Sequence, residues 1–138
     1  MVHALKEAWR VLNTKGILID QRPLSTEGRL DIDYKDRNEW VGNMDMSLGV
    51  KHDIAADRAI ESLVKDKYYI QLSTEKFQVA YYWKTVRGMV ADIRERWIDD
   101  VRLEDSLIQH AYELFRKHRR DRQVRLLMNI KLTKYEKR

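Results

Sequence analysis

The chain contains no cysteine among its 138 residues. This absence excludes disulfide bonds, thiolate catalysis and every cysteine-ligated zinc site. The four histidines form no H-E-x-x-H pattern, and His110 and His118 lie two helical turns apart, so the sequence predicts no metal site. No apolar run approaches the roughly 18 residues that span a bilayer, and the charged start MVHALKEAWR does not match a signal peptide. We therefore expect a cytoplasmic protein that does not enter membranes.

Glycine and proline are scarce, with five glycines and one proline. No G-x-G-x-x-G spacing exists, and no serine lies in a G-x-S-x-G context, so neither a glycine-rich phosphate loop nor a hydrolase nucleophile is indicated. The chain shows no linker, repeat or low-complexity tract. Its hydrophobic fraction of 43% and charged fraction of 36% are typical of a folded globular protein, and we predict one domain over residues 1–138.

Positive charge is concentrated at the C-terminal end of the chain. Residues 116–138 hold ten Lys or Arg against two acidic residues, a net charge of +8, so residues 1–115 carry a net −3. Such a cluster suits an anion-binding patch, but it also suits a solvated helix end, where cations offset the partial negative charge of the last carbonyl groups. The candidate anion-binding residues are Arg116, Arg119, Arg120 and Arg125.

The first 35 residues predict a helix followed by two strands. Residues 2–13 place Leu5, Ala8, Trp9 and Leu12 at helical spacing, and Gly16 is expected to take the left-handed conformation that ends a helix. The unbroken apolar run Ile17 to Ile19 predicts a strand buried on both faces. Alternation over residues 29–35 predicts a strand with one wet face, and residues 40–46 are a candidate hairpin partner. Asp31, Asp33 and Asp36 lack the calcium-loop spacing and are expected to face water.

The rest of the chain predicts three more helices and a closing strand. A helix is expected over residues 53–67 with Asp53 as its cap, another from Thr85, and a third from about Leu103. Residues 69–72 and 77–83 suit strands separated by a turn, or one bent ribbon, and residues 123–133 alternate clearly as a strand. We therefore predict an α/β fold of the α+β kind, with a partial, mixed, largely antiparallel sheet and about four helices.

Residues 4–19, ALKEAWRVLNTKGILI, resemble a segment of the class I S-adenosylmethionine-dependent methyltransferases, which commonly reads A-L-x-E-x-x-R-V-L-K-P-G-G-x-L. The matching positions are Ala4, Leu5, Glu7, Arg10, Val11, Leu12, Gly16 and Leu18, whereas Asn13-Thr14-Lys15 departs from the family pattern. The later order of an aromatic strand ending in Tyr81-Tyr82-Trp83, helices and a closing strand is similar to the C-terminal half of this Rossmann-like family.

The resemblance implies a methyltransferase-like domain without a cofactor site of its own. In this family a glycine-rich loop after the first strand and an acidic residue after the second bind the cofactor, and neither has a counterpart here. We therefore expect no catalysis by this chain alone, with S-adenosylmethionine bound only if a partner supplies the missing half. The strand at residues 17–21 lacks its family neighbour, so we expect an unpaired edge and a homodimer, or assembly with a separately encoded N-terminal half.

Three residues are candidates for binding a small ligand: Tyr82, Arg87 and His52. Strand alternation places Tyr81 and Trp83 toward the core and Tyr82 on the opposite face, near Arg87 in sequence. His52 beside Asp53 suits a general base, although helix capping by Asp53 is the favoured explanation of the pair. Two other functions stay open. One is a nucleic-acid-binding module that uses the basic C-terminal region with Arg125, Lys131 and Lys134. The other is a methyltransferase with a cofactor site of a different design.

Overall fold

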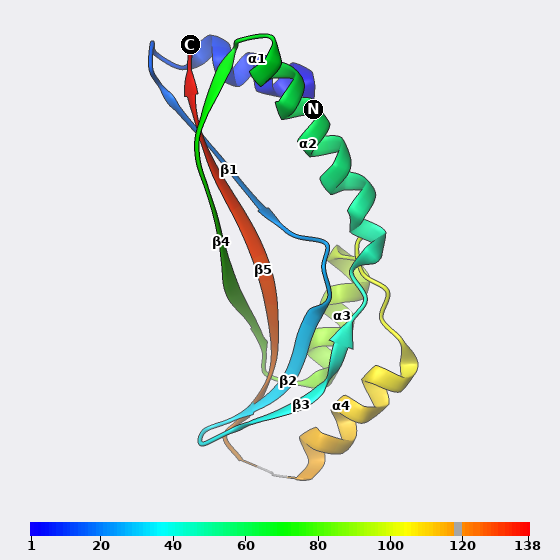
Figure 1. Ribbon diagram of the computed structural model, residues 1–138. Helices are drawn as coiled ribbons and strands as arrows, with labels where there is room; N and C mark the ends of the chain where they lie inside the picture. Colours follow the sequence, from blue (N-terminus) through cyan, green and yellow to red (C-terminus); the bar gives the residue numbers. More distant parts are fainter. Residues whose placement is uncertain (118–119) are drawn as a thin grey trace. The chain divides into compact units, whose positions relative to one another are not determined.

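The computed structural model describes residues 1–117 and 120–138, and these form one open antiparallel sheet with helices, as predicted (Figure 1). The strand order is β1-β5-β2-β3, and β4 pairs with β5. In chain order the elements are α1 (Val2–Val11), β1 (Ile17–Pro23), β2 (Gly28–Tyr34), β3 (Asn38–Met44), the 3-10 helix η1 (Ser47–Gly49), α2 (Val50–Lys65), β4 (Tyr69–Trp83), α3 (Val86–Arg96), α4 (Asp105–Lys117) and β5 (Arg122–Lys137).

The chain divides into two compact units, which are described separately. The first unit comprises residues 1–24, 51–77 and 130–138, and the second comprises residues 25–50 and 78–129. The long strands β4 and β5 contribute residues to both units. Along β5 the buried positions shift from even to odd residue numbers. The even-numbered residues from Val124 to Ile130 are buried, and beyond them Thr133 and Tyr135 are buried.

The core of the first unit is small and lies between α1, α2 and the strands. Its fully buried members are Ile60, Leu63, Tyr69 and Tyr135, and the helical stripe of α1 packs against them through Leu5, Trp9 and Leu12. The predicted apolar face of α2 is confirmed, with Ala56, Ala59, Ile60 and Leu63 buried. The capping prediction is wrong, because α2 begins at Val50 and Asp53 lies inside its first turn. A carboxylate there still favours the helix, since it faces the partial positive charge of the N-terminal amides.

Strand β1 is an edge strand, and the prediction that it is buried on both faces is wrong. It pairs with β5 from Ile17↔Glu136 to Pro23↔Ile130, and it lies at one end of the sheet order among the described strands. Leu18 packs against the core of the first unit, whereas Ile19 on the other face is 51% exposed. A continuous apolar run cannot distinguish a strand covered on both faces from an edge strand covered on one.

The turn between α1 and β1 uses its glycine for space rather than for backbone freedom. Lys15, not Gly16, adopts the left-handed conformation, with φ of 60°, so the prediction for Gly16 is wrong. A Cβ atom on Gly16 would lie 2.7 Å from the backbone oxygen of Asn13, which also accepts a hydrogen bond from the Gly16 amide at 2.8 Å. The turn is therefore too tight for any side chain at position 16.

Opposite effects are expected at these two neighbouring positions. Gly16→Ala should lower the free energy of unfolding by about 1–3 kcal/mol, because the added methyl group overpacks the turn against backbone. Lys15→Gly should be neutral or stabilising by up to about 1 kcal/mol, because glycine has no steric penalty at positive φ. Urea denaturation of both variants measures the difference, and a stable Gly16→Ala protein would contradict this account.

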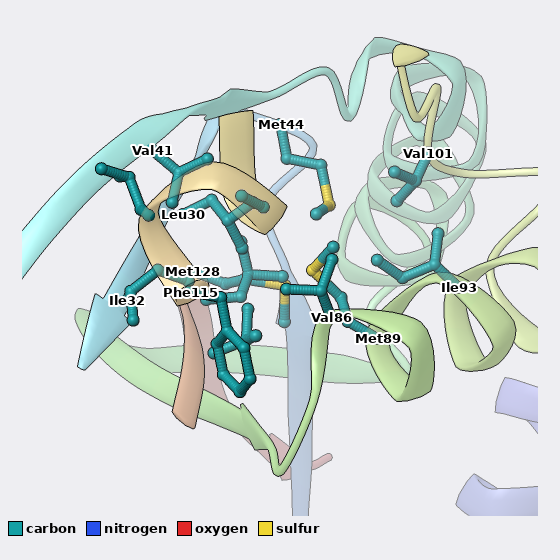
Figure 2. Packing of buried hydrophobic residues seen from close by; sticks show 14 of the residues in the cluster. Leu30, Ile32, Val41, Met44, Val86, Met89, Ile93, Val101, Phe115 and Met128 are labelled. Atoms are coloured by element: carbon teal, nitrogen blue, oxygen red, sulfur yellow. The ribbon is translucent and has the colours of Figure 1, made fainter. Parts of the chain in front are cut away.

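The second unit packs α3 and α4 on one face of its strands (Figure 2). The alternating residues Leu30, Ile32 and Tyr34 of β2 are buried as predicted, and β3 returns as the hairpin partner of β2. Helix α3 begins at Val86, directly after Thr85, where its start was predicted, and the Thr85 side chain caps it by accepting a hydrogen bond from the Gly88 amide at 3.0 Å. The remaining core residues of this unit include Val41, Met44, Val86, Met89, Ile93, Val101, Ala111, Leu114, Phe115, Val124, Leu126 and Met128.

Strand β4 runs without interruption from Tyr69 to Trp83, so of the two predicted alternatives the single ribbon is confirmed and the turn between two strands is absent. The prediction that Tyr81 is a core residue is only partly right. Its ring contacts Trp83 and Trp97, with centroid distances of 6.3 and 5.2 Å, but 45% of the residue is exposed. Phe77, which alternation places on the same face of β4 as Tyr81, is exposed as well. Ladder hydrogen bonds to β5 keep the strand extended where few of its side chains are covered.

Candidate functional site

A completely buried carboxylate marks the face of the second unit's sheet that does not contact α3 and α4. Asp31 of β2 has no exposed surface, although Asp31 was expected to face water. Arg29 donates to it from Nε at 2.9 Å, and Arg125 of β5 donates from a terminal nitrogen at 2.8 Å. The carboxylate is stable there because two guanidinium groups replace the water that burial removes.

Arg125 therefore belongs to an ion pair within the sheet. Burial lowers the pKa of Arg125, but the hydrogen bond and charge of Asp31, with smaller contributions from Tyr82 and Asp33, raise it overall. The guanidinium stays charged, and only 18% of its side chain is exposed. This candidate anion-binding residue thus has its charge largely matched by Asp31.

A second row of polar groups lies beside this ion pair. Asp33 of β2 accepts a hydrogen bond from the Gln123 amide at 2.9 Å. The Asn38 amide, oriented with its nitrogen toward Asp33, presents its oxygen to Arg125 at 3.1 Å. Both carboxylates are thereby held by side chains of the neighbouring strand β5, Asp31 by Arg125 and Asp33 by Gln123.

Two exposed aromatic rings flank the ion pair. Trp40 of β3 lies opposite Asp31 in the hairpin register, and Asp31 lies opposite Arg125. Strand β4 pairs with β5, and a side-chain hydrogen bond joins Gln78 of β4 to Asn129 of β5. In an antiparallel pair this register, continued by four residues along each strand, places Tyr82 opposite Arg125. The row thus reads Trp40, Asp31, Arg125, Tyr82 across four strands, and we call it the aromatic row. Trp40 is 56% exposed and Tyr82 is 50% exposed.

Among the candidate binding residues that the structure describes, Tyr82 and Arg125 lie together. Arg87 lies in the first turn of α3 and is exposed, and the guanidinium beside Tyr82 is that of Arg125. His52 is exposed on α2, in the first unit. Of the other basic candidates, Arg116 lies over the Tyr112 ring, whereas Arg120 lines a shallow hollow with Tyr34 and Arg37. Arg119, like His118, lies outside the described residues.

Lys131, a residue of the nucleic-acid hypothesis, is also paired within the protein. Its ammonium group donates to Asp57 of α2 at 2.7 Å, and Arg22 donates to the same oxygen at 2.7 Å. Burial would raise the pKa of Asp57, but hydrogen bonds from Lys131 and Arg22 and their charges lower it overall. These cations consequently stabilise the first unit and are poorly placed to contact phosphates.

The lowered pKa of Asp57 predicts a loss of stability in acid. Because the folded-state pKa lies below the unfolded value of about 3.8, the contribution of Asp57 is present above pH 4 and lost as pH falls through the folded pKa. Asp57→Asn should therefore be less stable at pH 7 and should lose less stability between pH 5 and 2. Thermal unfolding across this range tests the difference, with the exposed Asp66→Asn as the control. Parallel pH profiles for wild type and Asp57→Asn would contradict the assignment.

A separate hollow in the second unit opens beside α4, with a volume of about 520 Å³. His110 lines it, and Nδ1 of this residue lies 2.8 Å from the Val41 carbonyl oxygen. A carbonyl oxygen only accepts hydrogen bonds, so Nδ1 is the donor in this contact. Gly42 allows α4 to lie close to β3, because a Cβ atom at position 42 would lie 2.6 Å from a methyl carbon of Leu107. The hollow is polar, with Glu27, Asp45, Arg102, Glu104 and Ser106 around it.

Trp40 and Asp31 were missed as site residues by the sequence analysis. That Trp40 lies opposite Asp31 can be recognised only once the register of the β2–β3 hairpin is known. Within residues 1–117 and 120–138, no group of three or more His, Cys, Asp or Glu residues is placed to hold a metal ion. Among the helices that the structure describes, none has the length and apolarity needed to cross a membrane.

Comparisons of the chain with protein-family models, with curated proteins and with solved structures gave no match. A functional assignment therefore depends on the geometry described above and on the residues of the first segment.

Proposed function

We propose that this chain is a methyltransferase-like domain that acts through association at the free edge of β1, without a complete S-adenosylmethionine site of its own. The observation that carries the proposal is the exposed apolar edge formed by Ile17 and Ile19. Soluble proteins usually protect such an edge with charge, proline or a bulge, because unpaired backbone groups attract further strands. In β1 the charged residues Asp20 and Arg22 are paired with each other, Arg22 also pairs with Asp57, and Pro23 lies at the far end of the strand, away from Ile17 and Ile19.

The hydrogen-bond pattern of β1 supports a strand partner. The Lys137 amide donates to the Gly16 carbonyl at 2.8 Å, which makes this pair a hydrogen-bonded pair of the antiparallel ladder. Because the pairs alternate, the backbone groups of Ile17, Ile19 and Gln21 point away from β5 and toward the free edge. The same edge therefore offers both backbone hydrogen bonds and apolar side chains.

The local geometry of residues 4–19 also supports the methyltransferase resemblance. These residues form a helix, a tight turn that tolerates only glycine at position 16, and a strand, in the order of the family segment. The five glycines leave no cofactor loop within this sequence. A partner that completes the sheet beside β1 would occupy the place of the missing family strands.

A second copy of the chain is the partner to test first, by light scattering behind a sizing column. A homodimer of this 16.6 kDa chain has a molar mass of about 33 kDa. Ile19→Lys should yield monomer, because a charge on an edge strand opposes strand pairing. Leu72→Lys, at an exposed apolar position of β4, is the matched control and should remain dimeric. A wild-type protein that stays monomeric at high concentration would overturn the homodimer, and a separately encoded N-terminal half would then be the partner to test.

Calorimetric titration of S-adenosylmethionine and S-adenosylhomocysteine tests the other half of the proposal. We expect no heat of binding for the chain alone at ligand concentrations up to about 1 mM. A dissociation constant below about 100 μM, equivalent to about −5.5 kcal/mol, would overturn the proposal, because it would require a complete cofactor site within this chain.

A further inference from the structure

In the described part of the second unit, helices α3 and α4 both pack on the same face of its sheet. Helices α3 and α4 bury the even-numbered residues of β5, including Val124, Leu126 and Met128. The odd-numbered residues Arg125 and Asn129 on the other face are only half-buried. Among the described residues, the side chains that shield this face come from the strands themselves, chiefly Arg29, Arg125 and the polar row around Asp33.

The aromatic row crosses this open face. Trp40 and Tyr82 lie on β3 and β4, with β2 and β5 between them, so three strand spacings of about 4.8 Å separate them by about 14 Å. One flat ring is too small to contact both side chains. A ligand that uses the whole row must therefore carry at least two flat groups on a connecting backbone.

Two guanidinium groups lie pre-organised between the two rings. Asp31 holds Arg29 and Arg125 in place, and these three residues carry a net charge of +1, which Asp33 beside Arg125 offsets. The Arg29 side chain is 54% exposed, so its guanidinium remains accessible beside its bond to Asp31. An arginine held in this way suits contact with a phosphate or stacking on a base.

From this arrangement we propose that the aromatic row binds single-stranded nucleic acid. Single strands supply flat bases that stack on exposed rings, joined by phosphates that pair with arginine. The chain's net charge of +5 favours a polyanion. In a duplex the bases are already stacked on each other, so their faces do not reach Trp40 and Tyr82. This proposal shares Arg125 with the basic C-terminal region but places binding on the face that carries Trp40 and Tyr82, and it does not depend on the association proposed for β1.

Fluorescence anisotropy with labelled oligothymidylate and oligouridylate of about 12 nucleotides tests the proposal. Trp40→Ala and Tyr82→Ala should each weaken binding by about tenfold, because each removes one stacking platform. Tyr81→Ala is the matched control. Tyr81 is the preceding residue of the same strand and is 45% exposed, but it faces Trp83 and Trp97 on the other side of the sheet. Its affinity should stay within twofold of wild type.

Conservative variants keep the test valid if an alanine variant unfolds. Trp40→Phe and Tyr82→Phe retain a ring and should keep affinity within about threefold of wild type. Circular dichroism confirms the fold of each variant before binding is measured.

Three results would overturn the proposal. The first is no binding by the wild-type protein at 100 μM oligonucleotide. The second is equal binding of a duplex of the same length. The third is that Trp40→Ala and Tyr82→Ala bind with unchanged affinity, whereas the double variant Arg116→Glu/Arg120→Glu loses binding. That result would assign binding to the basic C-terminal region instead.

Discussion

Replacing Asp31 with alanine is expected to destabilise the protein by about 3–5 kcal/mol. Asp31 is fully buried and balances the charges of Arg29 and Arg125. Its removal leaves the mostly buried Arg125 guanidinium without its counter-charge, and an unpaired buried charge is far less stable than one in water. Because small domains have a total stability of about 5–15 kcal/mol, this change alone should greatly lower the urea midpoint of unfolding.

Two further variants separate this mechanism from a general sensitivity to substitution. Asp36→Ala removes an aspartate whose side chain is 75% exposed, and it should change stability by less than about 0.5 kcal/mol. Asp31→Leu combined with Arg125→Met should recover much of the loss, because an apolar pair has no charge to compensate. A double variant as unstable as Asp31→Ala would show that the packing of this patch matters more than its charge.

Leu63→Ala is expected to lower the free energy of unfolding by about 3 kcal/mol. Leu63 is completely buried in α2, in the small core of the first unit with Ile60, Tyr69 and Tyr135. The shortened side chain loses its transfer free energy and leaves a cavity that few neighbours can fill. Ile54→Ala, at a position on the same helix that is 45% exposed, should have little effect.

Hydrogen exchange of the Leu63→Ala protein should show where the loss is located. Local stability follows the packing of each region, and the two units have separate cores. Peptides from α2 should therefore lose protection more strongly than peptides from α4. Equal loss in both helices would show that the units unfold as one cooperative structure.

The secondary structure was largely predictable, and the errors have specific causes. Helices α2, α3 and α4 were found because their buried residues recur at helical spacing, and strand β2 because Leu30, Ile32 and Tyr34 alternate. Strand β1 was expected in the interior because Ile17 to Ile19 are all apolar. Apolar character shows which residues favour burial, but the elements packed above and below a strand decide how many of its faces are covered.

The candidate site was less predictable than the fold. Strand alternation placed Tyr82 on the face opposite the core, and the structure places it beside Arg125 rather than Arg87. Asp31 was assigned to water because aspartate is rarely buried without a partner. Its partners Arg29 and Arg125 lie two and 94 positions away in the chain, and the second of these pairings is invisible until β2 and β5 are in register.

The sequence by itself determined the local structure of this protein and the motif that resembles methyltransferases. Helical periodicity, strand alternation and the glycine in the first turn depend on residues a few positions apart, so they can be read along the chain. Only the tertiary structure decided which charges are paired, which sheet edge is free and which aromatic rings meet on one face. Those features depend on strand pairing between distant residues, where a shift of one position moves every side chain to the opposite face.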